Sequence, residues 1–209
     1  MPPARLITGF LWRFVLVYGL LIVPWPGFND AYGRYFRGLG QAAFAREHAQ
    51  RQVRFEAVPK ELKHVLDTRI ALANRDLLDR EGRGPVKYLE LDTRGIGWVP
   101  TALLVALVVA TPVSWRRRIP ALGWGMLAVH GFIWFSVAVH LWNNSSELSL
   151  VSLTPFWQRV AGGLDETLVT QMGASFVVPV FLWLLVIWRK QDVRAWQGAG
   201  GGRPSPRGK

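Results

Sequence analysis

The stretch IPALGWGMLAVHGFIWFSVAVHLW, Ile119–Trp142, is apolar enough and long enough to cross a lipid bilayer as a helix. A helix rises about 1.5 Å per residue and the hydrocarbon core is about 30 Å thick, so a crossing takes about 20 apolar residues. Inside lipid only a helix satisfies its own backbone hydrogen bonds within one segment. Three other runs have a similar composition, namely Leu6–Pro24, Ile96–Val113 and Gly173–Trp188. The sequence therefore predicts a mainly α-helical membrane protein with four transmembrane helices.

Basic residues beside the apolar runs predict the orientation of the chain. Arg116–Arg118 lie in a very short link between the second and third runs, Arg5 precedes the first run, and Arg189 follows the last. Short cytoplasmic loops are enriched in Arg and Lys. We therefore expect both termini and the triple-arginine link in the cytoplasm, with the two longer loops on the other side of the membrane.

The apolar runs divide the chain into four parts. We expect a first transmembrane helix in residues 1–25, an α+β extracytoplasmic domain in 26–95, three transmembrane helices in 96–188 with an extracytoplasmic loop at 143–170, and a disordered basic tail in 189–209. In the 143–170 loop, Glu147–Val160 is predicted to form a short interfacial helix that ends at Gly162-Gly163.

Composition restricts the partners. The net charge is +11 and there is no cysteine, which excludes disulfides, thiolate catalysis and Cys-ligated metals. We assign the basic excess to anionic lipid headgroups at the cytoplasmic face, at about 1 kcal/mol per residue. Nucleic acid is not an expected partner, because no basic soluble domain is predicted. The abundance of Arg, Ala and Gly is typical of a GC-rich bacterial genome, so the predicted location is the bacterial inner membrane.

The 26–95 segment changes its periodicity along its length. Its first part spaces apolar residues by three and four, which predicts an amphipathic helix that bends or breaks at Gly38 and Gly40. Alternating residues then predict a three-stranded antiparallel sheet built from Gln52–Glu56, Thr68–Leu72 and Val86–Leu91.

The sequence Leu-Asp-Thr-Arg occurs twice in this segment, at 66–69 and at 91–94. The repeat is either a coincidence or a pair of equivalent strand edges joined by Asp–Arg pairs, each contributing about 0.2–1 kcal/mol. Its charged residues are the candidate contacts to a partner or a lipid headgroup: Asp67, Arg69, Asp92 and Arg94.

Two ionisable residues fall inside the predicted membrane helices. For His130 we weigh a functional intramembrane group against a neutral imidazole bonded to a neighbouring helix, and favour the second. For Arg13 we weigh a buried partner against a side chain that reaches back to the headgroups, and again favour the second. Glu61 and His64 have a metal-ligand spacing, but a single copy is typical of a solvated surface. We predict no catalytic residue, no metal and no cofactor.

The chain resembles small membrane proteins associated with exosortases, of the exosortase H-associated type. The resemblance covers about residues 91–118, in DTRGIGWVP (Asp92–Pro100), ATP (Ala110–Pro112) and WRRR (Trp115–Arg118), although Trp98 stands where a tyrosine is expected. It implies a role beside a membrane-embedded transpeptidase that processes proteins carrying a C-terminal sorting signal. That transpeptidase resembles a cysteine enzyme, and this chain has no cysteine, so the resemblance implies an accessory role and transfers no catalytic residue.

The preferred function is therefore a non-catalytic accessory or assembly protein of an exosortase-type envelope sorting system, with an exosortase as the expected membrane protein partner. Two alternatives stay open. One is a small membrane enzyme or binding protein that acts on lipid or glycan headgroups at the outer face, where Arg69 and Arg94 would bind phosphate. The other is a transporter subunit.

Overall fold

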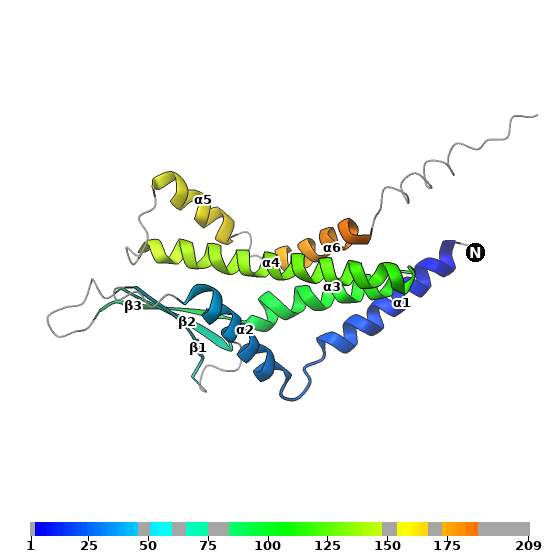
Figure 1. Ribbon diagram of the computed structural model, residues 1–209, viewed down its shortest axis with the longest axis horizontal. Coiled ribbons are helices and arrows are strands. Elements are labelled where there is room, and N and C mark those ends of the chain that lie inside the picture. Colours follow the sequence, from blue (N-terminus) through cyan, green and yellow to red (C-terminus); the bar gives the residue numbers. More distant parts are fainter. Residues whose placement is uncertain are drawn as a thin grey trace, which may run out of the picture.

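A computed structural model describes residues 3–45, 51–59, 66–74, 84–147, 154–166 and 173–187 (Figure 1). Its elements, in chain order, are α1 (Pro3–Ile22), α2 (Phe28–Phe44), β1 (Arg51–Ala57), β2 (Thr68–Asn74), β3 (Val86–Leu91), the π-helical turn η3 (Arg94–Trp98), α3 (Val99–Ala110), α4 (Trp115–Glu147), α5 (Pro155–Asp165) and α6 (Gly173–Ile187). The predicted tail and the Glu61–His64 motif lie outside the described residues.

The prediction of four transmembrane helices is wrong. Among the described helices, only α4 is long and apolar enough to cross a membrane, over Trp115–Ser145. The apolar segments described within the other helices, Ile7–Ile22, Arg94–Ala110 and Ser175–Ile187, have only 10–17 residues each. At about 1.5 Å per residue these segments reach at most ~26 Å, short of the ~30 Å hydrocarbon core. Helices α3 and α6 end at Ala110 and Ile187, before the apolar runs of the sequence end.

Two predicted connections are instead parts of the 33-residue helix α4. Arg116–Arg118, predicted as a link, form its first turns, and residues 143–146, predicted as the start of the extracytoplasmic loop, form its last. Arginine is a good helix former, so charge alone did not mark an interruption. The predicted helix Glu147–Val160 is also misplaced, because Glu147 ends α4 and the following helix, α5, runs through Gly162 and Gly163.

The three predicted strands are present and form an antiparallel sheet in the order β1-β2-β3. In the register of the sheet, Phe55 of β1 pairs with Ile70 of β2, which pairs with Leu89 of β3. All three side chains are buried, while their neighbours along each strand are more exposed. One face of the sheet therefore packs on the protein, as the alternation in the sequence requires.

Helix α2 covers the buried face of the sheet and is not broken at its glycines. A Cβ on Gly40 would lie only 2.5 Å from the ring of Phe55, so the glycine allows helix and strand to approach closely. Phe36 of α2 is 2% exposed and stacks on Trp134 of α4, with ring centroids 4.7 Å apart. A single apolar core continues from the sheet through these rings into the helices.

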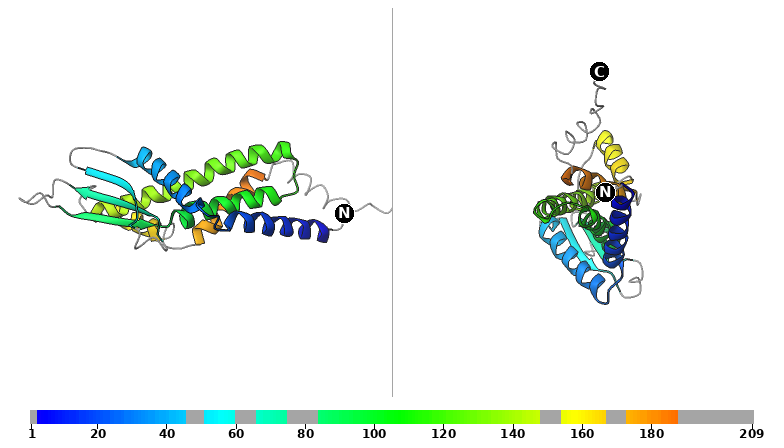
Figure 2. Two further views of the ribbon diagram at one scale, coloured as in Figure 1. Left: turned by 90° about the horizontal axis from the view of Figure 1, so that it is seen from below. Right: turned by 90° about the vertical axis from the view of Figure 1, so that its right-hand side faces the viewer.

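The molecule is elongated, with the sheet and α2 at one end and α1, α3 and the first half of α4 at the other (Figures 1 and 2). Helix α5 lies on the opposite side of α4 from the sheet. We call the α1, α3, α4 and α6 assembly the helical bundle. Its outer surface exposes many large apolar side chains, including Trp12, Leu16, Trp124, Leu127, Phe181 and Leu185.

Candidate functional site

The two Leu-Asp-Thr-Arg segments meet where the sheet joins the helical bundle. Asp67 lies just before β2, and Thr93 lies between β3 and η3. The backbone N–H of Thr93 donates to Asp67 Oδ1 at 3.0 Å, and the Thr93 hydroxyl donates to Asp67 Oδ2. Thr93 is fully buried. A carboxylate that accepts two hydrogen bonds from a buried residue fixes the positions of both segments, and a bond to a charged group contributes about 1.5–3 kcal/mol.

The residues on either side of Thr93 begin the helical turn and anchor it to α1. Asp92 accepts a hydrogen bond at 3.0 Å from the backbone N–H of Arg94, two residues further along the chain, which is the turn that aspartate side chains favour. The Arg94 guanidinium donates to the carbonyl oxygen of Ile22, at the end of α1. Trp98 Nε1 donates to the neighbouring carbonyl of Leu21 at 2.9 Å. These contacts satisfy carbonyl groups that the end of α1 leaves without helical partners.

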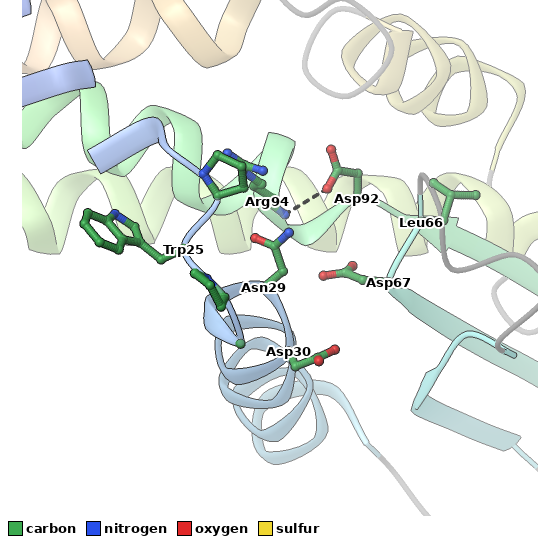
Figure 3. A pocket seen from close by; sticks show the side chains of 10 residues that line it. Trp25, Asn29, Asp30, Leu66, Asp67, Asp92 and Arg94 are labelled. Atoms are coloured by element: carbon green, nitrogen blue, oxygen red, sulfur yellow. Dashed lines mark hydrogen bonds between the residues drawn. The ribbon is translucent and has the colours of Figure 1, made fainter. Parts of the chain in front are cut away.

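An open pocket of about 680 Å³ lies at this junction (Figure 3). Asp67, Asp92 and Arg94 line one side, and Asn29 and Asp30 of α2 contribute to the rest of the wall. Three carboxylates and one guanidinium therefore face the same space. Arg37 of α2 approaches from beside it and donates to the Asp67 carbonyl oxygen at 3.1 Å.

The structure brings together three of the four candidate contact residues and separates the fourth. Arg69 lies on β2 and pairs with Glu90 of β3, at 3.2 Å. Its guanidinium also lies 4.6 Å from the ring centre of Tyr88. The two repeats are joined by the Asp67–Thr93 hydrogen bonds and not by the expected Asp–Arg pairs. Arg69 pairs instead with Glu90 across the sheet. A phosphate site with two arginines is consequently not assembled.

The two intramembrane candidates lie away from this junction. Arg13 is exposed on α1. His130, half-buried on α4, donates from Nδ1 to the Met126 carbonyl oxygen, one turn earlier, at 2.9 Å. The carbonyl can only accept, so this nitrogen carries the proton. Among the described residues, His130 is thus hydrogen-bonded within its own helix.

Sequence reasoning missed a second polar group, formed by α4 and α5. His140 Nδ1 lies 2.7 Å from Asp165 Oδ1, and the Asn143 side-chain amide donates to Asp165 Oδ2 at 2.9 Å. Asp165 is 9% exposed. His140 and Asn143 are one helical turn apart on α4, a spacing that places them on one face. That spacing is visible in the sequence, but nothing there indicates that Asp165 returns to meet it.

An aromatic cluster supports the junction from the α2 side. Tyr32 packs against Trp98 with ring centroids 5.7 Å apart, and Phe28 packs against the same indole at 4.7 Å. A Cβ on Gly97 would lie 2.5 Å from the Tyr32 hydroxyl. Burial raises the pKa of Tyr32 well above its usual range, and the nearby Tyr35 and Asp67 raise it further. Ionising Tyr32 would place a second negative charge near Asp67, so this hydroxyl stays neutral.

Within the described ranges, no group of three or more His, Asp or Glu side chains is placed to hold a metal ion. Comparison with protein-family models, curated proteins and solved structures finds no match for this chain.

Proposed function

We propose that this protein is a non-catalytic accessory or assembly protein of an exosortase-type system that sorts envelope proteins in the bacterial inner membrane. In this role the α2 and sheet region, which we call the α/β module, is presented to a membrane protein partner such as an exosortase. The helical bundle anchors the module beside the membrane.

One observation carries the proposal: the polar side chains of the junction hold the structure together. Asp67 accepts from Thr93, Asp92 accepts from the backbone of Arg94, and the Arg94 side chain donates to the end of α1. An enzyme needs a base or nucleophile poised beside a substrate. The same stretch, Asp92–Trp98, carries the resemblance to exosortase-associated proteins. A segment that sets the angle between module and bundle fits an assembly role.

The surface of the bundle supports the membrane location. Exposed apolar side chains cover α1, α4 and α6, with Trp12 67%, Trp124 68% and Leu185 73% exposed. Large exposed apolar side chains on three helices of one bundle favour contact with a membrane or another protein. Arg116 and Arg117 are exposed where α4 begins, at the end remote from the sheet. In the proposal they contact anionic lipids at the cytoplasmic face.

The binding or enzymatic alternative receives less support from the same pocket. Asp30, Asp67 and Asp92 line it with Arg94, so a phosphate would meet three carboxylates. Like charges disfavour an anionic headgroup there.

Co-purification tests the proposal. A tagged full-length chain is extracted from its native membrane in a mild detergent, and the captured proteins are identified by mass spectrometry. We expect an exosortase-type membrane peptidase or one of its sorted substrates. Arg94→Ala should reduce recovery of the partner, whereas Arg69→Ala, which removes contacts with Glu90 and Tyr88 on the sheet, should not. Recovery of the chain alone, at normal abundance and in several detergents, contradicts the proposal.

A further inference from the structure

A second cavity, of about 600 Å³, lies on another side of the junction. Ile22 of α1, Ile96 of η3, Val99 of α3 and Phe176 of α6 supply its apolar wall. Its polar lining comes from Glu90, Asp92, Arg94, His140 and Ser175. The volume falls within the range of about 300–1,000 Å³ that is typical of small-molecule sites.

The histidine in this cavity has a defined hydrogen-bonding state. The Asp165 carboxylate can only accept when ionised, so His140 Nδ1 carries a proton and donates to it. In the neutral ring the other nitrogen, Nε2, is then an acceptor. Asn143 holds the second oxygen of Asp165, which fixes the orientation of the pair. A hydroxyl group on a ligand suits this position, because it can donate to Nε2 of the neutral ring or accept from Nε2–H of the protonated ring.

The charged side chains that line the cavity do not favour an anion. Glu90 and Asp92 contribute two carboxylates and Arg94 contributes one guanidinium, and Glu90 is also paired at 3.2 Å with Arg69, which lies outside the lining. An anionic headgroup would lose its hydration and meet more carboxylates than guanidinium groups, which is unfavourable. An uncharged polar headgroup does not incur this loss.

We propose that this cavity is a binding site for an uncharged amphiphile that carries a hydroxyl or amide N–H donor. The donor bonds to His140 Nε2, and the Ser175 hydroxyl is available to donate to or accept from the same headgroup. The hydrocarbon chain lies against Ile22, Val99 and Phe176. The assignment does not depend on the proposed partner. Asp92 and Arg94 line the cavity as well as the junction, but the binding argument rests on the cavity and on the histidine–aspartate pair.

Binding of three matched oleoyl compounds tests the site: 1-monooleoylglycerol, methyl oleate and oleate. Native mass spectrometry of the full chain measures their affinities in a detergent without hydroxyl groups, because a sugar-based detergent is itself a hydroxylated amphiphile. We expect monooleoylglycerol to bind about fivefold to tenfold more tightly than methyl oleate. This ratio of affinities corresponds to the free energy of roughly one hydrogen bond. Oleate should bind more weakly than monooleoylglycerol. Equal affinities for the two neutral esters, or tightest binding of oleate, overturn the proposal.

Two variants locate the binding. Val99→Phe fills the cavity and should weaken binding of both esters by about tenfold or more, while Val105→Phe, the same change on the same helix outside the cavity lining, should not. His140→Leu should lower the affinity for monooleoylglycerol to that for methyl oleate. Because this change also removes the bond to Asp165, the thermal unfolding of each variant is measured too. Binding is then compared at a temperature at which every variant is folded. Unaltered binding by Val99→Phe contradicts the site even if His140→Leu unfolds.

A fourth ligand, dioleoylglycerol, separates two sources of the same chemistry. Binding at least as tight as that of monooleoylglycerol assigns the site to a two-chain membrane lipid. Weaker binding assigns it to a single-chain amphiphile. In both cases the preference for a hydroxyl over a methyl ester is the result that supports the site.

Discussion

Thr93 donates both its backbone N–H and its hydroxyl to the carboxylate of Asp67, across 26 residues of sequence. Each residue belongs to one of the two Leu-Asp-Thr-Arg segments. The aspartate of the first repeat thus binds the threonine of the second. Because Thr93 stands between β3 and η3, this contact fixes the point at which the chain passes from the sheet into the helical bundle.

A double-mutant cycle should show strong coupling between these two residues. Asp67→Ala and Thr93→Val are expected to lower the free energy of unfolding, with a coupling energy of about 1–3 kcal/mol. Denaturant titration in detergent micelles measures it. The comparison is the Arg69→Ala and Glu90→Ala pair, whose more exposed ion pair should couple by only about 0.2–1 kcal/mol. Equal coupling in the two cycles would contradict a special role for the Asp67–Thr93 contact.

Gly97→Ala should destabilise the protein by about 1–3 kcal/mol, because its Cβ would meet the Tyr32 hydroxyl at 2.5 Å. Tyr32→Phe removes that oxygen and should restore part of the loss when combined with it. Gly123→Ala on α4 is the matched control, since nothing lies within 4 Å of its added Cβ. It should be neutral or slightly stabilising, as expected for alanine in a helix. Thermal unfolding followed by circular dichroism distinguishes the three.

The raised pKa of Tyr32 predicts a loss of stability at high pH. The folded protein keeps this proton after the unfolded chain, with an ordinary tyrosine pKa of about 10, has lost it. The folded state then binds more protons than the unfolded state, so the free energy of unfolding falls as pH rises above about 10. Below that pH the contribution is complete. Tyr32→Phe should flatten this decline, and an unchanged pH profile would show that Tyr32 is not its source.

In the proposed sorting role, substitutions at the junction should matter more than substitution inside the bundle. Arg94→Ala and Asp92→Ala should impair processing of the sorted protein more than His130→Ala, because both residues set the start of η3 while His130 bonds only within α4. The measurement is the fraction of sorted substrate processed in cells, at matched protein abundance. Loss of processing in His130→Ala alone would place the functional site in the bundle.

The absence of cysteine allows the proposed orientation to be tested with single introduced thiols. Ala71→Cys, on β2, should react with a membrane-impermeant maleimide added outside intact cells after the outer envelope is permeabilised. Arg116→Cys, at the start of α4, should react only after the inner membrane is opened. The reverse pattern would place the α/β module in the cytoplasm and overturn the proposed orientation.

The sheet could be predicted from sequence because its signal is local. In β2 every second residue is buried, which is the alternation that the amino acids display. The bounds of the helices were harder to predict, because hydropathy reports the apolar content of a segment and not whether one helix continues through it. Thr111 takes an extended conformation that ends α3 before the apolar run does, whereas Arg116–Arg118 continue into α4 despite their charge.

The candidate site was predictable only in part, for a related reason. The repeat drew attention to Asp67, Asp92 and Arg94, but not to Thr93, whose importance depends on its burial. The pairing of His140 with Asp165 joins α4 to α5, and no pattern in one sequence encodes a contact between a histidine and a carboxylate 25 residues away.

Helix α4 has a mechanical consequence that depends on its continuity. It runs for 33 residues, about 50 Å, from Trp115 at one end of the bundle to Glu147 beside α5. Trp134, in its second half, stacks directly on Phe36 beneath the sheet. Because the helix is continuous, a change of its tilt at the Trp115 end also displaces the Glu147 end. In the proposed membrane location, a change in bilayer thickness or lateral pressure that tilts the bundle would therefore move the α/β module.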